Sequence, residues 1–436
     1  MQKCGKRVLT LLVLLLIGFT STSAVTAQAS EQLTSVINAL LSQHEIERKG
    51  PGHPLSNPND ASNNSFTYSS TLIQPPGDAY IIITDHKDPD CNAVLERLAN
   101  LHNGRIIHCD DFRSLPKEIR LRAGIFKQLQ EVKPKYVAIA PRLESFTENV
   151  VLSFWQLLCN FGGEKINVLP AFLVAGDANS LQHLVDHSTK DETDSKTRFS
   201  AVTIAQSTGQ RAGGDRAVRK AGFVSDLLAK LKVPNEAMIV RTPIAPPDRY
   251  PNLATLGCYD TSQDGLLHEL SPDAKRAMTK ARLLTLFGHG SPSMTCSVQV
   301  SAFKDVPFDD KVVLCGSCFS CYPPNSDLQK NGHANSESFF ERAIENSARV
   351  FYGHMRENGG FPLMFVAMES LLQGESVGES YQRVLNTVVA QAKISTRQLI
   401  MTPEQLATPN ALGERNGFLI IMIGDPAARP FATNAF

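Results

Sequence analysis

Short apolar runs alternate with stretches of helical spacing through most of the chain after residue 78. In the first half, four apolar runs predict strands at Ala79–Thr84, Arg105–Cys109, Tyr136–Ala140 and Ala171–Ala175. Between them, apolar residues recur three and four positions apart, which predicts helices at Asn92–Leu101, Lys117–Gln130 and Val150–Cys159. Strands that alternate with helices in this way favour a parallel sheet covered by helices on both faces.

The second half repeats this alternation after a polar stretch, Asp186–Lys196, that we expect to be an exposed loop. Predicted strands are Ser200–Ala205, Met238–Arg241, the two apolar runs that end at His289 and Cys318 (within Leu283–Ser291 and Lys311–Ser320), Arg349–Tyr352 and Gly417–Ile423. Predicted helices are Asp215–Leu231, Ser338–Asn346, Pro362–Gln373 and Ser376–Gln391. We therefore expect an α/β fold with two adjacent, mostly parallel sheets flanked by helices, a three-layer α/β/α sandwich. Its N-terminal subdomain would span 73–198 and its second, catalytic subdomain 199–436.

Residues 1–29 have the features of a secretory signal peptide. Basic residues at positions 3, 6 and 7 precede an apolar segment from Val8 to Phe19, and a small-residue cleavage pattern ends at Ala29. The apolar segment is too short to span a bilayer comfortably, although an uncleaved anchor is the alternative interpretation. Residues 30–72 read as a helix and a linker, a candidate pro-segment. The mature chain is thus expected to be extracytoplasmic, either periplasmic or secreted.

Composition narrows the range of partners. The 436 residues are 42% hydrophobic and 20% charged, and the formal net charge is zero. Without a basic excess, nucleic acid is not an expected partner. No later segment approaches 18 unbroken apolar residues, so we expect no stable membrane span after signal cleavage. The oligomeric state is left open.

Two of the apolar runs end in residues that can react together. His289 lies between two glycines after one run, and Cys318 follows Ser317 after the next. Because the carboxyl ends of neighbouring parallel strands meet at one edge of a sheet, we expect the imidazole and the thiol to lie close together. A thiol becomes a strong nucleophile when an imidazole takes its proton. The backbone N–H groups of Gly290 and Cys318 are candidate oxyanion-hole donors.

This pair resembles the His-Gly and small-Cys signatures of the caspase-like cysteine peptidases, which include caspases, legumains, metacaspases and gingipains. Three segments resemble gingipains in particular: residues 336–343, Ala348–Gly353, and Gly417–Arg429 with its Gly-Asp-Pro turn. The likeness covers roughly residues 75–432. It implies an exported endopeptidase with a caspase-like fold, a protein or peptide substrate, a Cys-His dyad that forms a thioester acyl-enzyme, and no cofactor.

The nucleophile segment departs from the family by carrying three cysteines, Cys315, Cys318 and Cys321. In the family the nucleophile lies just beyond the strand after a small residue, which favours Cys318. Family members often pair the histidine with an acidic residue from an earlier segment. Asp260 and Asp264, in a turn-rich stretch before the histidine strand, are the candidates here.

A second hypothesis keeps the fold and removes the catalysis. In this interpretation the chain is a non-catalytic binding or assembly protein, and the three cysteines at 315, 318 and 321 form a disulfide or a zinc site. Cys296, His289 or His333 would supply the fourth zinc ligand. The reactivity of the Cys318 thiol separates the two hypotheses, because a disulfide or a metal would consume it.

Overall fold

The computed structural model describes residues 72–189, 199–207, 216–241, 256–328, 337–357, 362–392, 394–406 and 412–431. All of them belong to one compact unit, Arg48–Phe436. The predicted signal peptide at 1–29 and the predicted helix and linker up to residue 71 lie outside the described residues. We call residues 72–189 the N-terminal half and residues 199–431 the C-terminal half.

Eleven strands form one continuous sheet, in the order β2-β1-β3-β4-β14-β13-β12-β8-β5-β6-β7. Their bounds are β1 Ala79–Thr84, β2 Arg105–His108, β3 Pro134–Ala140, β4 Leu169–Phe172, β5 Ala201–Ser207, β6 Asn235–Arg241, β7 Gly257–Asp260, β8 Leu283–Phe287, β12 Val312–Cys315, β13 Val350–His354 and β14 Ile420–Ile423. A smaller sheet joins β9 Gly290–Ser291, β10 Met294–Thr295 and β11 Val298–Gln299.

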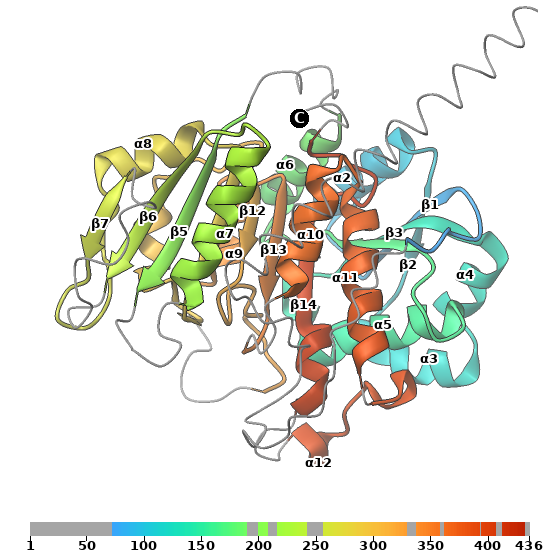
Figure 1. Ribbon diagram of the computed structural model, residues 1–436. Helices are drawn as coiled ribbons and strands as arrows, with labels where there is room; N and C mark the ends of the chain where they lie inside the picture. The colour runs from blue at the N-terminus through green and yellow to red at the C-terminus, as the bar shows by residue number, and fades with distance from the viewer. Residues whose placement is uncertain are drawn as a thin grey trace, which may run out of the picture. The chain divides into compact units, whose positions relative to one another are not determined.

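Helices cover both faces of the large sheet. Figure 1 shows α7, α10 and α11 in front of the strands and α6 and α9 behind them. The helices are α2 Pro89–Leu101, α3 Leu115–Leu121, α4 Ile125–Val132, α5 Glu148–Phe161, α6 Ala178–Thr189, α7 Arg216–Lys230, α8 Pro272–Lys280, α9 Phe339–Glu345, α10 Pro362–Leu372, α11 Val377–Gln391 and α12 Pro403–Leu406. The predicted α/β class, with a mostly parallel sheet between layers of helices, is confirmed.

Strand β14 joins the two halves of the sheet. It pairs antiparallel with β13 over Phe351–His354 and meets β4 through one residue pair, Ile423 with Phe172. The other strand pairings described in the large sheet are all parallel. The two sheets expected from the sequence therefore meet edge to edge through β14 and form one.

The chain after β14 returns to the N-terminal half. Asp425 is 2% exposed and accepts hydrogen bonds from Tyr80 Oη and His102 Nε2, both at 2.8 Å. Burial alone would raise the pKa of Asp425, but the hydrogen bond and charge of His102, with donors at Ala427 and Tyr80, outweigh it and lower the pKa. The carboxylate thus ties the C-terminal segment to β1 and α2.

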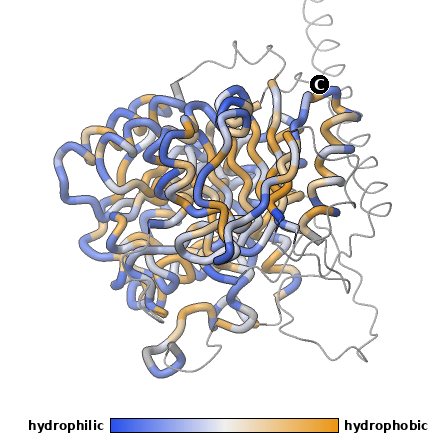
Figure 2. The backbone as a smooth tube through the Cα atoms, turned by 90° about the vertical axis from the view of Figure 1, so that its left-hand side faces the viewer, coloured by the Kyte–Doolittle hydropathy of each residue, from blue (hydrophilic) through white to orange (hydrophobic). Residues whose placement is uncertain are grey.

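The core lies along the strands, because their side chains are apolar on both faces. Strands β8, β12 and β14 are buried at every position, as expected for central strands with helices on each side. Figure 2 shows hydrophobic segments gathered in the interior. Trp155 of α5 is fully buried, and its Nε1 donates to the Phe418 carbonyl at 2.8 Å.

Two element predictions differ from the structure. The helix expected at Lys117–Gln130 is split into α3 and α4, because Arg122 and Gly124 adopt positive φ values of 50° and 55°. The loop expected at Asp186–Lys196 begins too early, since α6 continues to Thr189. The rest of that predicted loop, 190–196, lies outside the described residues.

Candidate functional site

Strands β8 and β12 carry the two residues singled out in the sequence. They pair in parallel, with Leu286 opposite Cys315, and the Gly316 amide donates to the Leu286 carbonyl at 2.9 Å. His289 and Cys318 each lie three residues beyond this matched pair. Because the register is equal on both strands, the two residues leave the same edge of the sheet at the same level.

The two segments are in contact just beyond the strands. A Cβ built on Gly290 would lie 2.1 Å from the Cys318 carbonyl oxygen and 2.9 Å from the Ser317 Cβ. Only glycine therefore permits the chain after His289 to pass so close to the chain at Cys318. The sequence expectation that these two segments meet agrees with this arrangement.

The three cysteines differ in accessibility. Cys315 and Cys321 are both 0% exposed, whereas Cys318 is partly exposed. Burial raises the pKa of Cys315 and raises that of Cys321 well above its usual range. The Cys315 sulfur also lies 3.2 Å from the Thr295 hydroxyl. Among these three thiols, Cys318 is therefore the one that a reagent or substrate reaches.

The exposed imidazole of His289 sits on a backbone held by a residue that the sequence reading missed. Gln206, at the end of β5, accepts a hydrogen bond from the His289 amide at 2.6 Å. Its Nε2 donates to the Ser297 hydroxyl at 2.5 Å, and its side chain is 6% exposed. A Cβ at Gly288 would come within 2.7 Å of the Gln206 Cβ. The sequence signal for Gln206 was a polar residue near the end of a predicted buried strand, β5, which neighbours the strand that leads to His289.

The hairpin after His289 directs the Gly290 amide outward. The Cys296 amide donates to the His289 carbonyl at 2.8 Å, so His289 and Cys296 form a hydrogen-bonded pair of the hairpin. The next pair along the hairpin is Gly290 with Thr295. Hydrogen-bonded and non-hydrogen-bonded pairs alternate in an antiparallel ladder, so the Gly290 N–H points away from β10. Since β9 is an edge strand of the small sheet, this donor faces out of that sheet. This orientation is compatible with the predicted role of the Gly290 N–H as an oxyanion-hole donor.

The two candidate acidic partners lie elsewhere. Asp260 ends the edge strand β7, three strands from β8, which is about 14 Å at the usual strand spacing. Its carboxylate is bound by Arg241 at 2.8 Å. Asp264 is paired with His268 at 2.8 Å on the surface. At that distance Asp260 does not reach His289, and neither carboxylate gains support as its partner.

The alternative chemistry of the cysteines requires a disulfide or a metal site. None of the eight cysteines among the described residues is joined in a disulfide. Within the described ranges, no group of three or more His, Cys, Asp or Glu side chains is arranged to hold a metal ion. Residue His333, one proposed zinc ligand, lies outside those ranges. Among the described residues, no helix is both long and apolar enough to cross a membrane.

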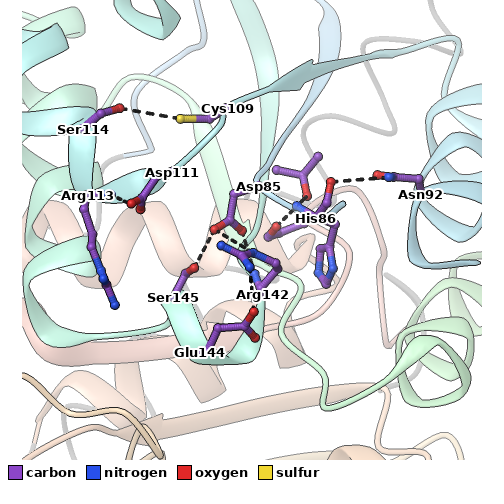
Figure 3. A network of polar contacts seen from close by, with 12 residues as sticks. Asp85, His86, Asn92, Cys109, Asp111, Arg113, Ser114, Arg142, Glu144 and Ser145 are labelled. Atoms are coloured by element: carbon purple, nitrogen blue, oxygen red, sulfur yellow. Dashed lines mark hydrogen bonds and ion pairs between the residues drawn. The ribbon is translucent and has the colours of Figure 1, made fainter. Parts of the chain in front are cut away.

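The N-terminal half has its own polar cluster where β1 and β3 end (Figure 3). Asp85 is 1% exposed and accepts from the Arg142 amide at 2.8 Å, from Arg142 Nε at 3.3 Å and from the Ser145 hydroxyl at 2.5 Å. Arg142 also binds Glu144 at 2.7 Å. Both oxygens of Asp85 are therefore engaged by the loop that follows β3.

Comparison with known proteins adds little to this geometry. No protein-family model matches the chain, and no curated protein matches it either. A solved structure described as a protease aligns with 9% identity and a TM-score of 0.49, covering 81% of this chain and 78% of that one. The separase–securin complex of Saccharomyces cerevisiae aligns with 11% identity and a TM-score of 0.38, covering 67% of this chain and 15% of that one. At these scores the similarities carry no argument about activity.

Proposed function

We propose that this chain is an exported cysteine endopeptidase of the caspase-like kind, with Cys318 as nucleophile and His289 as general base. One observation carries the proposal. Cys318 and His289 follow register-matched positions of adjacent parallel strands, and the glycine after His289 is packed against the Cys318 backbone. Cys318 is also the accessible thiol of the three in its segment.

The proposed reaction divides peptide hydrolysis into two steps. The His289 imidazole takes the proton from the Cys318 thiol, and the thiolate attacks the peptide carbonyl carbon to form a tetrahedral oxyanion. Donation from the Gly290 and Cys318 amides stabilises that oxyanion. The imidazolium then protonates the leaving amine as the C–N bond breaks, which leaves a thioester. Water, deprotonated by His289, attacks the thioester, releases the carboxylic acid product and restores the thiol.

The proposed substrate is a protein or peptide, and the proposed location is outside the cytoplasm. The location rests on the signal-peptide features of residues 1–29. Such an enzyme needs no cofactor, because the dyad supplies both the nucleophile and the proton transfers.

The experiment that tests this function is cleavage of a positional-scanning peptide library by the mature chain, residues 30–436. Cys318→Ala and Cys315→Ala are assayed beside it, before and after limited proteolysis that would remove a pro-segment. Cleavage by the wild type and by Cys315→Ala, with none by Cys318→Ala, supports the proposal and reports the preferred residue. No cleavage by any of the three would reject the peptidase and favour the binding protein.

A further inference from the structure

A buried glutamate of the N-terminal half contacts the C-terminal half close to Cys318. Glu148 is the first residue of α5 and is 0% exposed. One of its carboxylate oxygens accepts from Arg356 Nε at 2.6 Å and from the Ser326 hydroxyl at 2.6 Å. The other accepts from the Asp327 amide at 2.8 Å. All of these donors follow strands β12 and β13, so the carboxylate joins two parts of the chain that are far apart in sequence.

Arg356 in turn holds the residues that follow Cys318. Its carbonyl accepts a hydrogen bond from the Phe319 amide at 3.2 Å. Its guanidinium lies 5.9 Å from the centre of the Phe319 ring and 5.5 Å from that of the Tyr322 ring, within the range of cation–π attraction. The same guanidinium also bonds the Ser326 hydroxyl. One arginine thus contacts the segment after Cys318 through both its backbone and its side chain.

The residue held in this way has an unfavourable backbone conformation. Phe319 has a φ of +56°, a region that aromatic residues rarely adopt and that persists only where surrounding contacts impose it. Phe319 directly follows Cys318, so its backbone conformation helps to set the direction of the peptide group that joins them. Two further bonds hold the far end of the turn, from the Cys321 amide to the His354 carbonyl and from the Phe340 amide to the Ser320 carbonyl.

We infer that Arg356 and Glu148 are positioning residues for Cys318, and that the N-terminal half thereby controls the geometry of the nucleophile. Glu148 fixes the guanidinium, the guanidinium and the Arg356 carbonyl fix Phe319, and Phe319 fixes the turn that presents the thiol. The inference deepens the proposed function and rests on it, because a positioned nucleophile matters only if Cys318 reacts. Misplacement of a reacting group by about 1 Å costs about 100-fold in rate, so a small change in this turn has a large effect.

The Asp85–Arg142 pair offers a matched control (Figure 3). Like Glu148, Asp85 is a buried carboxylate bound by an arginine and a serine hydroxyl, and it also follows a strand of the large sheet. Its contacts stay within the N-terminal half and do not involve the segment after Cys318. Arg142→Met therefore removes a comparable ion pair without touching the nucleophile turn.

The test compares full-length Arg356→Met, Arg356→Lys and Glu148→Gln with wild type and Arg142→Met. Three quantities are measured: hydrogen exchange of the backbone over residues 317–322, the rate at which iodoacetamide alkylates Cys318 as mapped by peptide mass, and kcat and KM for a cleaved peptide. Exchange and alkylation report on the turn whether or not the chain cleaves peptides. Failure of this inference is thus distinct from failure of the proposed function.

We expect Arg356→Met to speed exchange over 317–322, to slow Cys318 alkylation about tenfold, and to lower kcat about 10- to 100-fold with KM within about twofold. Arg356→Lys should recover part of each loss, and Arg142→Met should match wild type in all three. Glu148→Gln keeps the side-chain volume and should show the same changes to a smaller extent. This variant also tests the inference if Arg356→Met does not fold. Exchange and alkylation in Glu148→Gln and in the folded Arg356 variants equal to those of Arg142→Met would overturn the inference.

Discussion

The carboxyl ends of the strands carry polar residues in both halves of the sheet, but the two clusters differ in what remains available. In the N-terminal half, Asp85 is buried and both of its oxygens are bound by the loop after β3. In the C-terminal half, His289 is exposed and Cys318 is partly exposed, and their segments touch through a glycine. The same architecture thus produces a closed structural network at one place and an accessible thiol and imidazole at the other.

The difference shows which polar clusters at a sheet edge deserve a chemical interpretation. A carboxylate whose acceptors are all used stabilises the loop that uses them, and it has little capacity left for a ligand. A thiol and an imidazole at a solvent-reachable edge can be reached by a substrate or a reagent. Position at the carboxyl ends of parallel strands is common to both clusters, so position alone does not identify a site.

Loss of the imidazole should give the largest effect. His289→Ala should lower kcat/KM for a cleaved peptide by at least about 1000-fold, because the nucleophile and its base act as a unit. The control is His268→Ala, which removes an exposed histidine and the partner of Asp264. Peptide cleavage by His289→Ala at a rate close to that of His268→Ala would contradict the assignment of the base.

Loss of the closed network should instead affect folding. Asp85→Asn removes the charge that pairs with Arg142 and places the side-chain amide of asparagine among the Arg142 and Ser145 donors. We therefore expect the free energy of unfolding to fall by about 3 kcal/mol. Urea denaturation measures this change. Activity per folded molecule should stay within about twofold of wild type. A folded Asp85→Asn protein that has lost catalysis would show that the N-terminal cluster belongs to the active site after all.

Close packing between the two reactive segments should be the next most sensitive feature. In Gly290→Ala the new Cβ would lie 2.1 Å from the Cys318 carbonyl oxygen, so the segments must separate. We expect kcat/KM to fall about 100-fold, since the thiol and the imidazole would no longer be aligned. Gly176→Ala is the control, because its Cβ would meet nothing closer than 3.9 Å. Equal activity in both variants would refute the contact.

Acid sensitivity should arise from a buried histidine beside the site. Burial, with the charge of Lys220, lowers the pKa of His354 to about 3, against about 6.5 in an unfolded chain. Between these two pKa values the unfolded state binds more protons than the folded state. The contribution of neutral His354 to the free energy of unfolding is therefore complete above about pH 6.5 and declines as the pH falls towards 3. At pH 5 the loss is about 2 kcal/mol.

His354→Leu removes that titration. Urea denaturation of the variant at pH 7 and at pH 5 should show a difference between the two conditions that is smaller by about 2 kcal/mol than in wild type. An unchanged difference would mean that other groups cause the acid sensitivity. His354 ends β13, and its side chain is only 3% exposed.

Several features of the fold follow from local sequence patterns. β1 has the predicted bounds, and α11 begins after Ser376, whose side chain forms a capping box with Glu379. The matched ends of β8 and β12 were also predictable in outline, since each apolar run is followed by small residues and then by a reactive one. In these cases the signal lies within a few neighbouring residues.

Other features depend on residues far apart in the chain and could not be predicted. β14 covers only the second part of the predicted strand Gly417–Ile423, because the chain up to Leu419 forms a 3-10 helix. Its place between β4 and β13 is decided by packing between the halves. The contact of Glu148 with Arg356 joins residues 208 positions apart, and no spacing rule connects them. Helix α6 was missed because its sequence is largely polar, yet it packs against α2 and α9, and Leu181 and Leu184 are buried.

The most direct test of the account is the pH dependence of Cys318 alkylation. Folded wild-type and His289→Ala proteins are treated with iodoacetamide between pH 5 and 9, and each cysteine is followed by peptide mass. The account predicts that wild-type Cys318 reacts rapidly well below pH 8.5, the ordinary thiol pKa, that this reactivity shifts to higher pH without His289, and that buried Cys315 and Cys321 stay unlabelled. A Cys318 that is inert until the protein unfolds, or that titrates identically without His289, would contradict it.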